Sequence, residues 1–380
     1  MNVDRIPFLS LGPGPDDAAV REALDRVLTR GHFVLGPEGE AFEAEFARAS
    51  GAAHAAGVGN GTDALALILR ALDIGPGDDV VVPSLSAAYT ALAVTMVGAR
   101  PVFADVEPGR LTMDPRSCEA RITPRTRAII PVHLFGQAAD LTALEAVARA
   151  SGVALVEDCC QAHLATAGGR PVGTVGVAGA FSFYPTKNLG ALGDGGAVVT
   201  GDRALDARVR RLRNGGQAAR YDHQEAGVNS RLDELQAAVL RARLPRLAGW
   251  TARRRAIAAR FRAGLAASGV TPVPELDAGH VYHLFPVRHP KRDHLRAALD
   301  AAGVDTLIHY PVPLHEQRAF ASANPAPCPV AAAASAELVS LPLHPGLLDA
   351  QVDRILAAVI AATRGPLERS PLEPEEAGRS

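Results

Sequence analysis

Short apolar runs alternate with helical spacing of apolar residues over the first two thirds of the chain. Apolar runs of about four to eight residues are typical of strands buried on both faces, and apolar residues three and four apart indicate amphipathic helices. We expect strands at 52–58, 79–83, 101–106, 128–134, 153–158, 180–183 and 197–200. We expect helices at 16–30, 41–50, 62–72, 88–97, 141–151, 202–213, 232–247 and 250–265. This alternation predicts an α/β fold with a mostly parallel sheet covered by helices on both faces.

The pattern changes near residue 250, where shorter strands and helices and a region rich in His and Pro begin. We therefore expect a large domain at 1–249 and a smaller C-terminal α/β domain at 250–364. Residues 365–380 are rich in Pro, Glu and Ser, a composition that predicts a disordered tail.

Composition limits the possible partners. The chain has 380 residues and a formal charge of −2, with Arg and acidic residues interspersed, so it offers no basic field for nucleic acid or an anionic membrane. Because it shows neither a signal segment nor an apolar run of about 18 residues, we expect a cytoplasmic protein. Its four cysteines lack the spacing of metal ligands, so we expect no metal site.

Lysine is rare in this chain, and one lysine lies in a glycine-rich segment. Of the 39 Lys and Arg residues, only Lys187 and Lys291 are lysines. A guanidinium stays protonated in proteins, whereas a buried ammonium can lose its proton and attack a carbonyl carbon. Lys187 is followed by four glycines up to Gly196, and we interpret it as a reactive amine. Lys291 lies in a polar run and needs no such explanation.

Two other segments carry chemistry that suits such an amine. Gly59, Gly61 and Thr62 stand where a predicted strand gives way to a helix, and the free N–H groups of a helix start can bind phosphate. Glu157 and Asp158 end an apolar strand, and because side chains alternate along a strand, only one of them can face a ligand. An amine, a carboxylate and a phosphate site at the ends of one sheet's strands are what pyridoxal 5′-phosphate requires. We choose Asp158 for the ring nitrogen and Gln161 for the ring hydroxyl.

With these motifs in this order, the chain resembles the DegT/DnrJ/EryC1/StrS family of pyridoxal-phosphate aminotransferases that act on sugar nucleotides. The resemblance covers nearly the whole chain. The segments that carry it are Gly36-Pro-Glu38, Gly59-Asn-Gly-Thr-Asp-Ala-Leu65, Pro131-Val-His-Leu-Phe-Gly-Gln137, Glu157-Asp158, Gln161-Ala-His163, the lysine stretch Phe181 to Gly196, Asn229-Ser-Arg-Leu-Asp-Glu234 and His309-Tyr-Pro-Val-Pro313.

The resemblance implies an aspartate-aminotransferase-like fold (fold type I) and a homodimer with shared active sites. It implies that Lys187 forms a Schiff base with the cofactor, that Asp158 faces the pyridine nitrogen and that Gln161 lies by the ring oxygen. It assigns Gly61, Thr62 and Ser182 to the phosphate, together with the partner subunit's Asn229. His309 and Tyr310 are candidates for contact with the sugar or its diphosphate.

The resemblance also implies the reaction. The expected amino donor is L-glutamate and the expected acceptor is a nucleotide-linked keto sugar, with C3 of a dTDP-3-keto-6-deoxyhexose favoured by the lysine stretch. C4 amination of a dTDP-, UDP- or GDP-4-keto-6-deoxyhexose and amination of an aminocyclitol ketone are the alternatives. A non-catalytic regulator is disfavoured because the chain has no added helix-turn-helix or basic patch.

One segment departs from the family pattern. Many members stack an aromatic residue on the cofactor ring, whereas this chain has Ala87 at the aligned position and Tyr89 two residues later. Either the Ala87 methyl packs on the ring or Tyr89 turns in to replace the aromatic residue, and the methyl is slightly favoured. Cys159 and Cys160 replace small alanines of the family, a modest change in volume.

Overall fold

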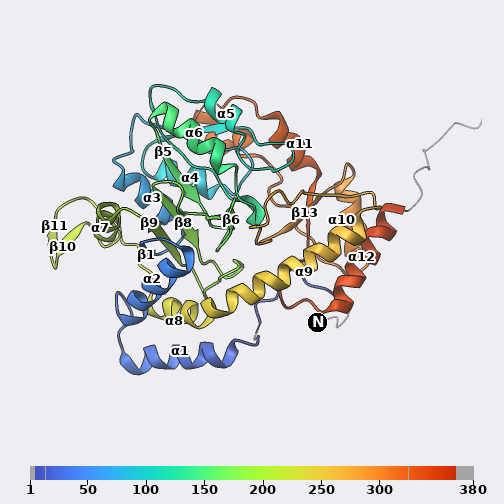
Figure 1. Cartoon of the computed structure of the whole chain (residues 1–380), viewed down its shortest axis with the longest axis horizontal. Helices are drawn as coiled ribbons and strands as arrows, with labels where there is room; N and C mark the ends of the chain where they lie inside the picture. Colours follow the sequence, from blue (N-terminus) through green and yellow to red (C-terminus); the bar gives the residue numbers. More distant parts are fainter. Residues whose placement is uncertain (1–4, 13, 324, 365–380) are drawn as a thin grey trace, which may run out of the picture.

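A seven-stranded sheet forms the centre of the computed structural model, which describes residues 5–12, 14–323 and 325–364 (Figure 1). Its strand order is β1-β9-β8-β5-β4-β2-β3. The strands are β1 (His54–Val58), β2 (Asp79–Pro83), β3 (Arg100–Ala104), β4 (Thr126–Ile129), β5 (Ala154–Asp158), β8 (Ala178–Ser182) and β9 (Gly196–Thr200). β8, β5, β4, β2 and β3 pair in parallel, and β9 runs antiparallel to both of its neighbours. The prediction of a mostly parallel sheet is confirmed.

Helices cover both faces of this sheet, and the strand residues alternate between the two. Val80 and Val82 belong to one buried apolar cluster, while Val81 between them belongs to another on the opposite face. The first cluster includes residues of α3 (Gly61–Ala71), α4 (Tyr89–Met96), α7 (Arg203–Leu212) and α11 (Pro329–Glu337). The second includes residues of α2 (Pro37–Ser50), α5 (Pro115–Ala120), α6 (Leu141–Ser151) and α8 (Glu234–Arg243). The near-continuous apolar strands of the sequence are explained by this two-sided burial.

The N-terminal helices are joined to a segment almost 200 residues later. The carboxylate of Glu234, at the start of α8, accepts hydrogen bonds of 2.7–3.0 Å from the N–H groups of Gly36, Glu38 and Gly39. These N–H groups lie at the first turn of α2, where no preceding helical turn supplies carbonyl acceptors. α1 (Asp17–Arg30) packs against α8 as well. The buried Glu234 therefore acts as the N-cap that α2 lacks in its own sequence.

A second, smaller sheet lies toward the C-terminal end of the chain, next to the long α9 (Leu247–Leu265). Its strands β12 (Thr271–Pro272), β13 (Phe285–Arg288) and β14 (Leu338–Leu341) are antiparallel. α10 (Arg292–Ala301) and α12 (Asp349–Arg364) pack with α9 around a separate apolar cluster, which Ile6 from the N-terminal segment joins. The predicted boundary at 249/250 falls inside α9, and the division into 1–249 and 250–364 stays a prediction. The predicted tail, 365–380, lies outside the described residues.

Several elements differ from those expected. The predicted helix 232–247 is interrupted by a 3-10 turn at Leu244–Arg246, because Pro245 has no N–H to continue α-helical bonding. The predicted strand 128–134 ends at Ile129, two residues before Pro131, and Phe135 then adopts a φ of 61° inside a 3-10 turn. Two short hairpins, β6–β7 (Thr166–Ala167, Arg170–Pro171) and β10–β11 (Gln217–Ala219, Asp222–His223), were not expected. Their two- and three-residue strands are too short to leave a periodic signal.

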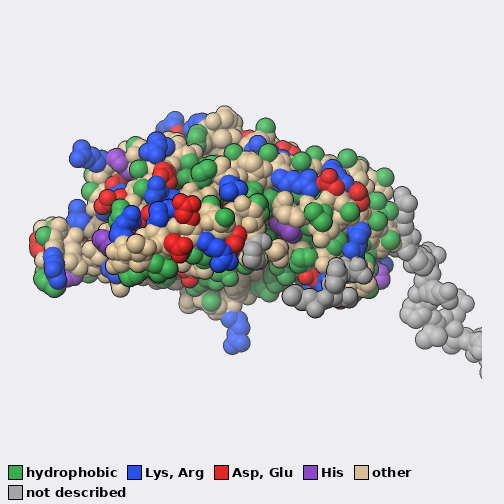
Figure 2. All heavy atoms as spheres, turned by 90° about the horizontal axis from the view of Figure 1, so that it is seen from below, with side chains coloured by type: hydrophobic (Ala, Val, Ile, Leu, Met, Phe, Trp, Pro, Cys, Tyr) green, Lys and Arg blue, Asp and Glu red, His purple; other side chains and the backbone are tan. Residues whose placement is uncertain are grey.

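Charges are mixed over the surface. On the face seen in Figure 2, arginine and acidic side chains lie side by side rather than in patches of one sign. Among the helices that the structure describes, none combines the length and the apolar character that crossing a membrane would require.

Candidate active site

Lys187 lies in a tight loop that connects β8 to the antiparallel β9. The loop is closed by backbone bonds from Phe183 N to the Gly195 carbonyl (2.7 Å) and from Ala191 N to the Phe183 carbonyl (2.7 Å). Gly190 packs against Pro185 so closely that a Cβ at Gly190 would lie 2.5 Å from the Pro185 carbonyl oxygen. The glycines that follow the lysine therefore allow the chain to fold back on itself and fix the lysine at the carboxyl end of β8.

The amine of Lys187 is held in surroundings that favour its neutral form. Burial lowers its pKa below the ordinary value of 10.5, and this effect outweighs the opposite influence of Cys160 and Asp158. Within the described residues, no hydrogen bond is made by its Nζ. A desolvated amine without a hydrogen-bond partner can act as a nucleophile and a base, which is the role expected for Lys187 from the sequence.

The start of α3 forms a cradle beside this lysine. Asn60 caps the helix by accepting from Asp63 N at 2.8 Å, and within the described part of the chain no group accepts from the N–H of Gly61 or Thr62. A Cβ at Gly61 would lie 2.6 Å from the Cys160 Sγ and 2.9 Å from the Ser182 Cβ. Only glycine therefore lets the helix start approach Ser182, and the free N–H groups can bind an anion there.

Asp158 lies at the carboxyl end of β5, which pairs with β8 in the sheet. Its Oδ2 accepts a hydrogen bond from the Thr90 hydroxyl at 2.7 Å, and its Oδ1 accepts from Cys160 N at 3.1 Å. The side chain is 5% exposed. Two hydrogen bonds leave acceptor capacity on this carboxylate, which can hold a protonated ring nitrogen.

Glu157 points to the opposite face of the sheet and is fully bonded there. Its Oε2 accepts from Gly173 N (2.7 Å) and His133 Nε2 (3.0 Å), and its Oε1 accepts from Val175 N and Gly176 N (both 2.8 Å). These bonds hold its pKa below the ordinary value of 4.5 in spite of its burial. Glu157 and Asp158 thus face opposite sides of the sheet, as strand alternation predicted, and the role of Asp158 at the ring nitrogen stays a prediction.

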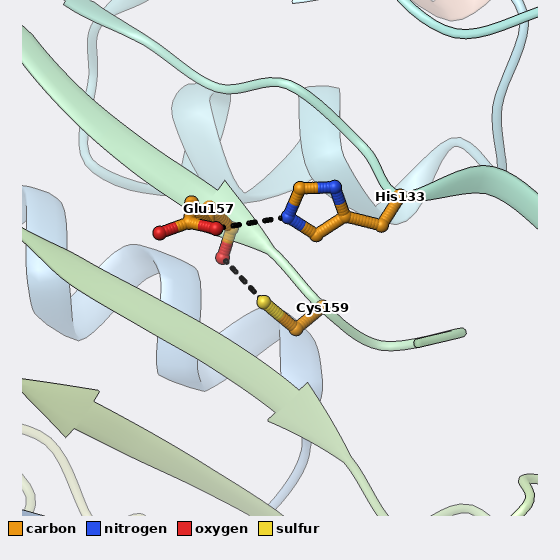
Figure 3. Close-up of side chains that lie close together, drawn as sticks. All are labelled: His133, Glu157 and Cys159. Atoms are coloured by element: carbon orange, nitrogen blue, oxygen red, sulfur yellow. Dashed lines mark hydrogen bonds and ion pairs between the residues drawn. The ribbon is translucent and has the colours of Figure 1, made fainter. Parts of the chain in front are cut away.

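His133, Glu157 and Cys159 lie close enough together to suggest a metal site (Figure 3). Ala139 N donates to the His133 Nδ1 at 3.1 Å, so the other nitrogen, Nε2, carries the hydrogen that it donates to Glu157. The Cys159 thiol donates to the Glu157 carbonyl at 3.8 Å, and burial raises its pKa well above 9.0. A protonated imidazole nitrogen and a protonated thiol are not metal ligands, so we interpret this cluster as a structural brace.

Gln161 and Tyr310 join the site from two distant segments. The Gln161 Oε1 accepts from Phe135 N at 2.8 Å, and its Nε2 donates to the Tyr310 hydroxyl at 2.5 Å. The Tyr310 ring is stacked on the Phe135 ring with 6.5 Å between centroids. Gln161 is thus held in place by the protein, and the second hydrogen of its amide remains for a ligand.

His309 lies next to Tyr310 in the chain but faces a different part of the site. Its Nδ1 is 2.9 Å from the Ser340 Oγ, and its ring lies beside that of Phe8. Burial, with a smaller contribution from the Lys187 charge, lowers the His309 pKa to about 4. Its ring is therefore neutral at physiological pH and can serve as a hydrogen-bonding group rather than as a cation.

Asn229, Ala87 and Tyr89 make no side-chain hydrogen bond to the other site residues within the described chain. The side chain of Asn229 is exposed, and its backbone forms a bridge with Asn214 rather than with the Lys187 loop. Tyr89 is 64% exposed at the first residue of α4, while Ala87 is partly buried.

Several residues around the site were not predicted from the sequence. Thr90 bonds Asp158, and His163 bonds the Ser182 carbonyl at 2.8 Å through its Nε2. Asn188, the residue after the lysine, has its Oδ1 3.1 Å from the His283 Nδ1. His163 and Asn188 lie within the segments that carry the family resemblance, so the sequence offered a reason to consider them. Thr90 lies in an ordinary apolar helix and has none.

Together these residues fit pyridoxal 5′-phosphate. The α3 start and the Ser182 hydroxyl can hold the phosphate, Asp158 can hold the ring nitrogen, and the Lys187 amine can react with the aldehyde. The close packing of Gly61 against Cys160 and Ser182 brings the anion cradle and the Asp158 segment together.

Comparison with known proteins agrees with this geometry. The sequence profile of the DegT/DnrJ/EryC1/StrS aminotransferase family matches residues 16–360. The chain is 49% identical over 361 residues to a dTDP-3-amino-3,4,6-trideoxy-alpha-D-glucose transaminase of Streptomyces venezuelae, covering 93% of this chain and 95% of the relative. It is 46% identical over 342 residues to a UDP-N-acetyl-3-dehydro-alpha-D-glucosamine 3-aminotransferase of Acidithiobacillus ferrooxidans, covering 90% and 92%.

A solved structure shows the same fold. The crystal structure of S. venezuelae DesV in complex with a ketimine intermediate superposes with a TM-score of 0.92 at 47% identity, covering 95% of this chain and 99% of that one.

Proposed function

Because the chain belongs to the DegT/DnrJ/EryC1/StrS aminotransferase family, whose cofactor is pyridoxal 5′-phosphate, we propose that it transfers an amino group from L-glutamate to a keto group on a nucleotide-linked sugar. The observation that carries this proposal is the desolvated Lys187 amine, placed between the Asp158 carboxylate and the anion cradle of α3. A scaffold without catalysis has no use for such an amine.

We place the amination at C3 of a dTDP-3-keto-6-deoxyhexose. Support comes from the names of the two relatives above, both of which are 3-amination enzymes acting on different nucleotides. C4 amination and amination of an aminocyclitol ketone are the competing outcomes. An assay of the purified protein with L-glutamate and a panel of dTDP-, UDP- and GDP-linked 3-keto and 4-keto sugars tests this choice, and turnover limited to 4-keto sugars would contradict it.

Lys187 and Asp158 have different roles in the proposed reaction. The bound cofactor supplies an electron sink for the negative charge that develops at the reacting carbon. Burial favours the neutral form of the Lys187 amine, so its Nζ can accept the proton that leaves the donor's α carbon. The same nitrogen then delivers that proton to the cofactor. Asp158 holds the ring nitrogen in its protonated form, and Thr90 and Cys160 N orient that carboxylate.

The active form is proposed to be a homodimer in the cytoplasm, with the partner subunit's Asn229 reaching the phosphate. Large apolar side chains that are 37–52% exposed support an interface: Phe33, Val34, Leu35, Tyr184 and Leu192. The exposed Asn229 side chain is available to a second copy. Light scattering during gel filtration gives the mass of the particle, and a monomer with full activity would contradict the shared site.

Replacing the lysine tests the whole assignment. Lys187→Ala is expected to abolish transamination and the visible absorption of the lysine-bound cofactor, because the chain's other lysine is the exposed Lys291. Borohydride reduction followed by mass spectrometry should label Lys187 alone. The matched control is Lys291→Ala, which removes the chain's other lysine, an exposed one, and should keep activity and colour. An active, coloured Lys187→Ala protein would contradict the proposal.

A further inference from the structure

A cleft of about 380 Å³ opens beside the lysine loop, between the N-terminal segment 7–11 and the small C-terminal sheet. Thr186, the residue before the lysine, lies on its wall, together with His283 and His309. Most of the remaining wall is apolar: Phe8, Leu9, Leu11, Leu284, Leu307 and Leu343. The cleft therefore adjoins the reacting amine and offers both an apolar surface and a few polar groups.

Arg254 of α9 lines this cleft as a buried cation without a carboxylate partner. It is 4% exposed, and its Nη1 donates to the carbonyls of Leu343 (2.8 Å), Tyr282 (3.2 Å) and His283 (3.4 Å). Its Nε is buried without a hydrogen-bond partner, and no bond from Nη2 is found within the described residues. No ion pair of Arg254 is found there either. A buried charge of this kind is costly unless an anion compensates it.

Asn188 and His283 connect this cation to the Lys187 segment through a short series of contacts. Asn188 follows the lysine and contacts the His283 ring at 3.1 Å, and the carbonyl of His283 accepts from Arg254. Asn188 also donates to the Val281 carbonyl at 3.0 Å. The guanidinium and the amine are therefore linked through one short, buried network, and Thr186, the residue before the lysine, shares the cleft wall with Arg254.

The other titratable groups around the cleft leave its positive charge uncompensated. The pKa of His283 lies well below 6.5 and that of His309 is about 4, mainly because both are buried, so both rings are neutral. Burial lowers the Arg254 pKa to about 10, at which the guanidinium remains protonated under physiological conditions. Asp305 is the acid on the cleft wall, and its carboxylate already pairs with Arg5 at 2.6 Å.

We propose that Arg254 binds a carboxylate of the amino-acid donor, with the apolar wall of the cleft holding the donor's methylene groups. This inference rests on the proposed aminotransferase function and specifies the residue that selects the donor. A free guanidinium edge matches a carboxylate, and the chain of two methylenes in glutamate matches the leucine-lined wall. A sugar nucleotide is a poorer occupant, because its diphosphate would need more than one cation and its sugar would meet apolar side chains.

The test separates the two halves of the reaction. In Arg254→Gln and Arg254→Lys, the L-glutamate concentration that half-saturates conversion of the bound cofactor to its amine form should rise about 10- to 100-fold. The reaction of the amine form with the keto sugar should keep its wild-type rate and half-saturation. Calorimetric titration of the holoenzyme with glutarate should show binding that weakens by the same factor in both variants.

The matched control is Arg255→Gln on the same helix. Arg255 is exposed and donates to the His280 carbonyl at 2.9 Å, so it supports the same backbone segment without lining the cleft. Equal losses in both half-reactions, or no change in either, would overturn the role of Arg254. If the Arg254 variants do not fold, wild-type binding of glutarate but not of neutral glutaramide supports the proposal, and equal binding of the two overturns it. Absence of any donor reaction in the wild-type protein would instead refute the aminotransferase function itself.

Discussion

Glu157 and Asp158 are adjacent on one strand, yet their carboxylates differ in how many hydrogen bonds they accept. Four donors occupy the Glu157 carboxylate, so it has little capacity left for a ligand. Only two donors hold Asp158, which lies close enough to Lys187 to influence the pKa of its amine. The pleat of the strand makes this separation, because neighbouring residues face opposite sides.

The end of β5 therefore serves two purposes, one for stability and one for ligand binding. The Glu157 carboxylate joins the 133–139 and 173–176 segments to β5 and stabilises the fold, whereas Asp158 keeps free acceptor sites for the role that we propose at the ring nitrogen. A free acceptor on a buried acid is worth little to stability and is valuable to function. Substitutions at the two positions should therefore change different properties.

Removing the Asp158 charge should have the largest effect. Asp158→Asn is expected to lower turnover by about 10²- to 10³-fold, since losing an opposite charge lowers the partner's pKa by 1–3 units. Its unfolding temperature should change little, because the amide oxygen can still accept from Cys160 N while its NH₂ donates to the Thr90 hydroxyl, which can also act as an acceptor. Steady-state kinetics and thermal unfolding of the same preparation measure both, and a folded variant with wild-type turnover would contradict the role of Asp158.

Glu157→Gln should mainly reduce stability, by about 2–3 kcal/mol. Both oxygens of Glu157 accept from N–H groups, so an amide must point its NH₂ at a donor whichever way it turns. Urea unfolding gives the change in free energy, and activity per folded molecule should stay near that of the wild type. Glu145→Gln removes a partly exposed carboxylate and is the control, with an expected loss under about 1 kcal/mol.

As the pH falls, protonation linked to the buried His163 should destabilise the fold before protonation of Glu157 does. Burial lowers the His163 pKa from 6.5 to about 3, so unfolding takes up a proton there and stability falls as the pH drops from 6.5 toward 3. The lowered pKa of Glu157 affects stability only below about 4.5. Each such group contributes about 1.4 kcal/mol per pH unit within its window.

The measurement is the free energy of unfolding by urea between pH 7 and pH 5, where buried His280, His309 and His344 act with the same sign as His163. His163→Gln should reduce the slope by about one proton. A slope equal to that of the wild type would show that His163 is charged in the folded protein.

The smallest expected effect belongs to Thr90. Thr90→Val removes the hydroxyl that bonds Asp158 and should lower turnover by about 10-fold or less, equivalent to one hydrogen bond to a charged group. Thr90→Ser keeps the hydroxyl and should restore activity. If the serine variant is as slow as the valine variant, the methyl group rather than the hydrogen bond positions Asp158.

The parts of the site that could be predicted lie within short stretches of sequence. Lys187 was marked by the scarcity of lysine and by the glycines after it, and strand alternation predicted that only one of Glu157 and Asp158 faces the site. The cradle at Gly61 followed from a glycine at a helix start. In each case the chemistry and its geometric reason lie within a few residues of each other.

The parts that escaped prediction depend on contacts between distant segments. Nothing local distinguishes Arg254 from the other arginines of α9, because its burial depends on carbonyls at 282, 283 and 343. Thr90 and Tyr310 matter only because the fold brings them to Asp158 and Gln161. The break at Pro245 was readable and was missed, since the apolar spacing continues through it.

The bond between Glu234 and the start of α2 has a consequence for synthesis of the chain. As the ribosome releases the first 60 residues, neither the cap of α2 nor β9, the sheet partner of β1, has yet been made. The N-terminal segment therefore cannot form all of its native hydrogen bonds until residue 234 emerges. Contacts between residues so far apart in the sequence form slowly. The amino terminus of this protein is made first and completed late.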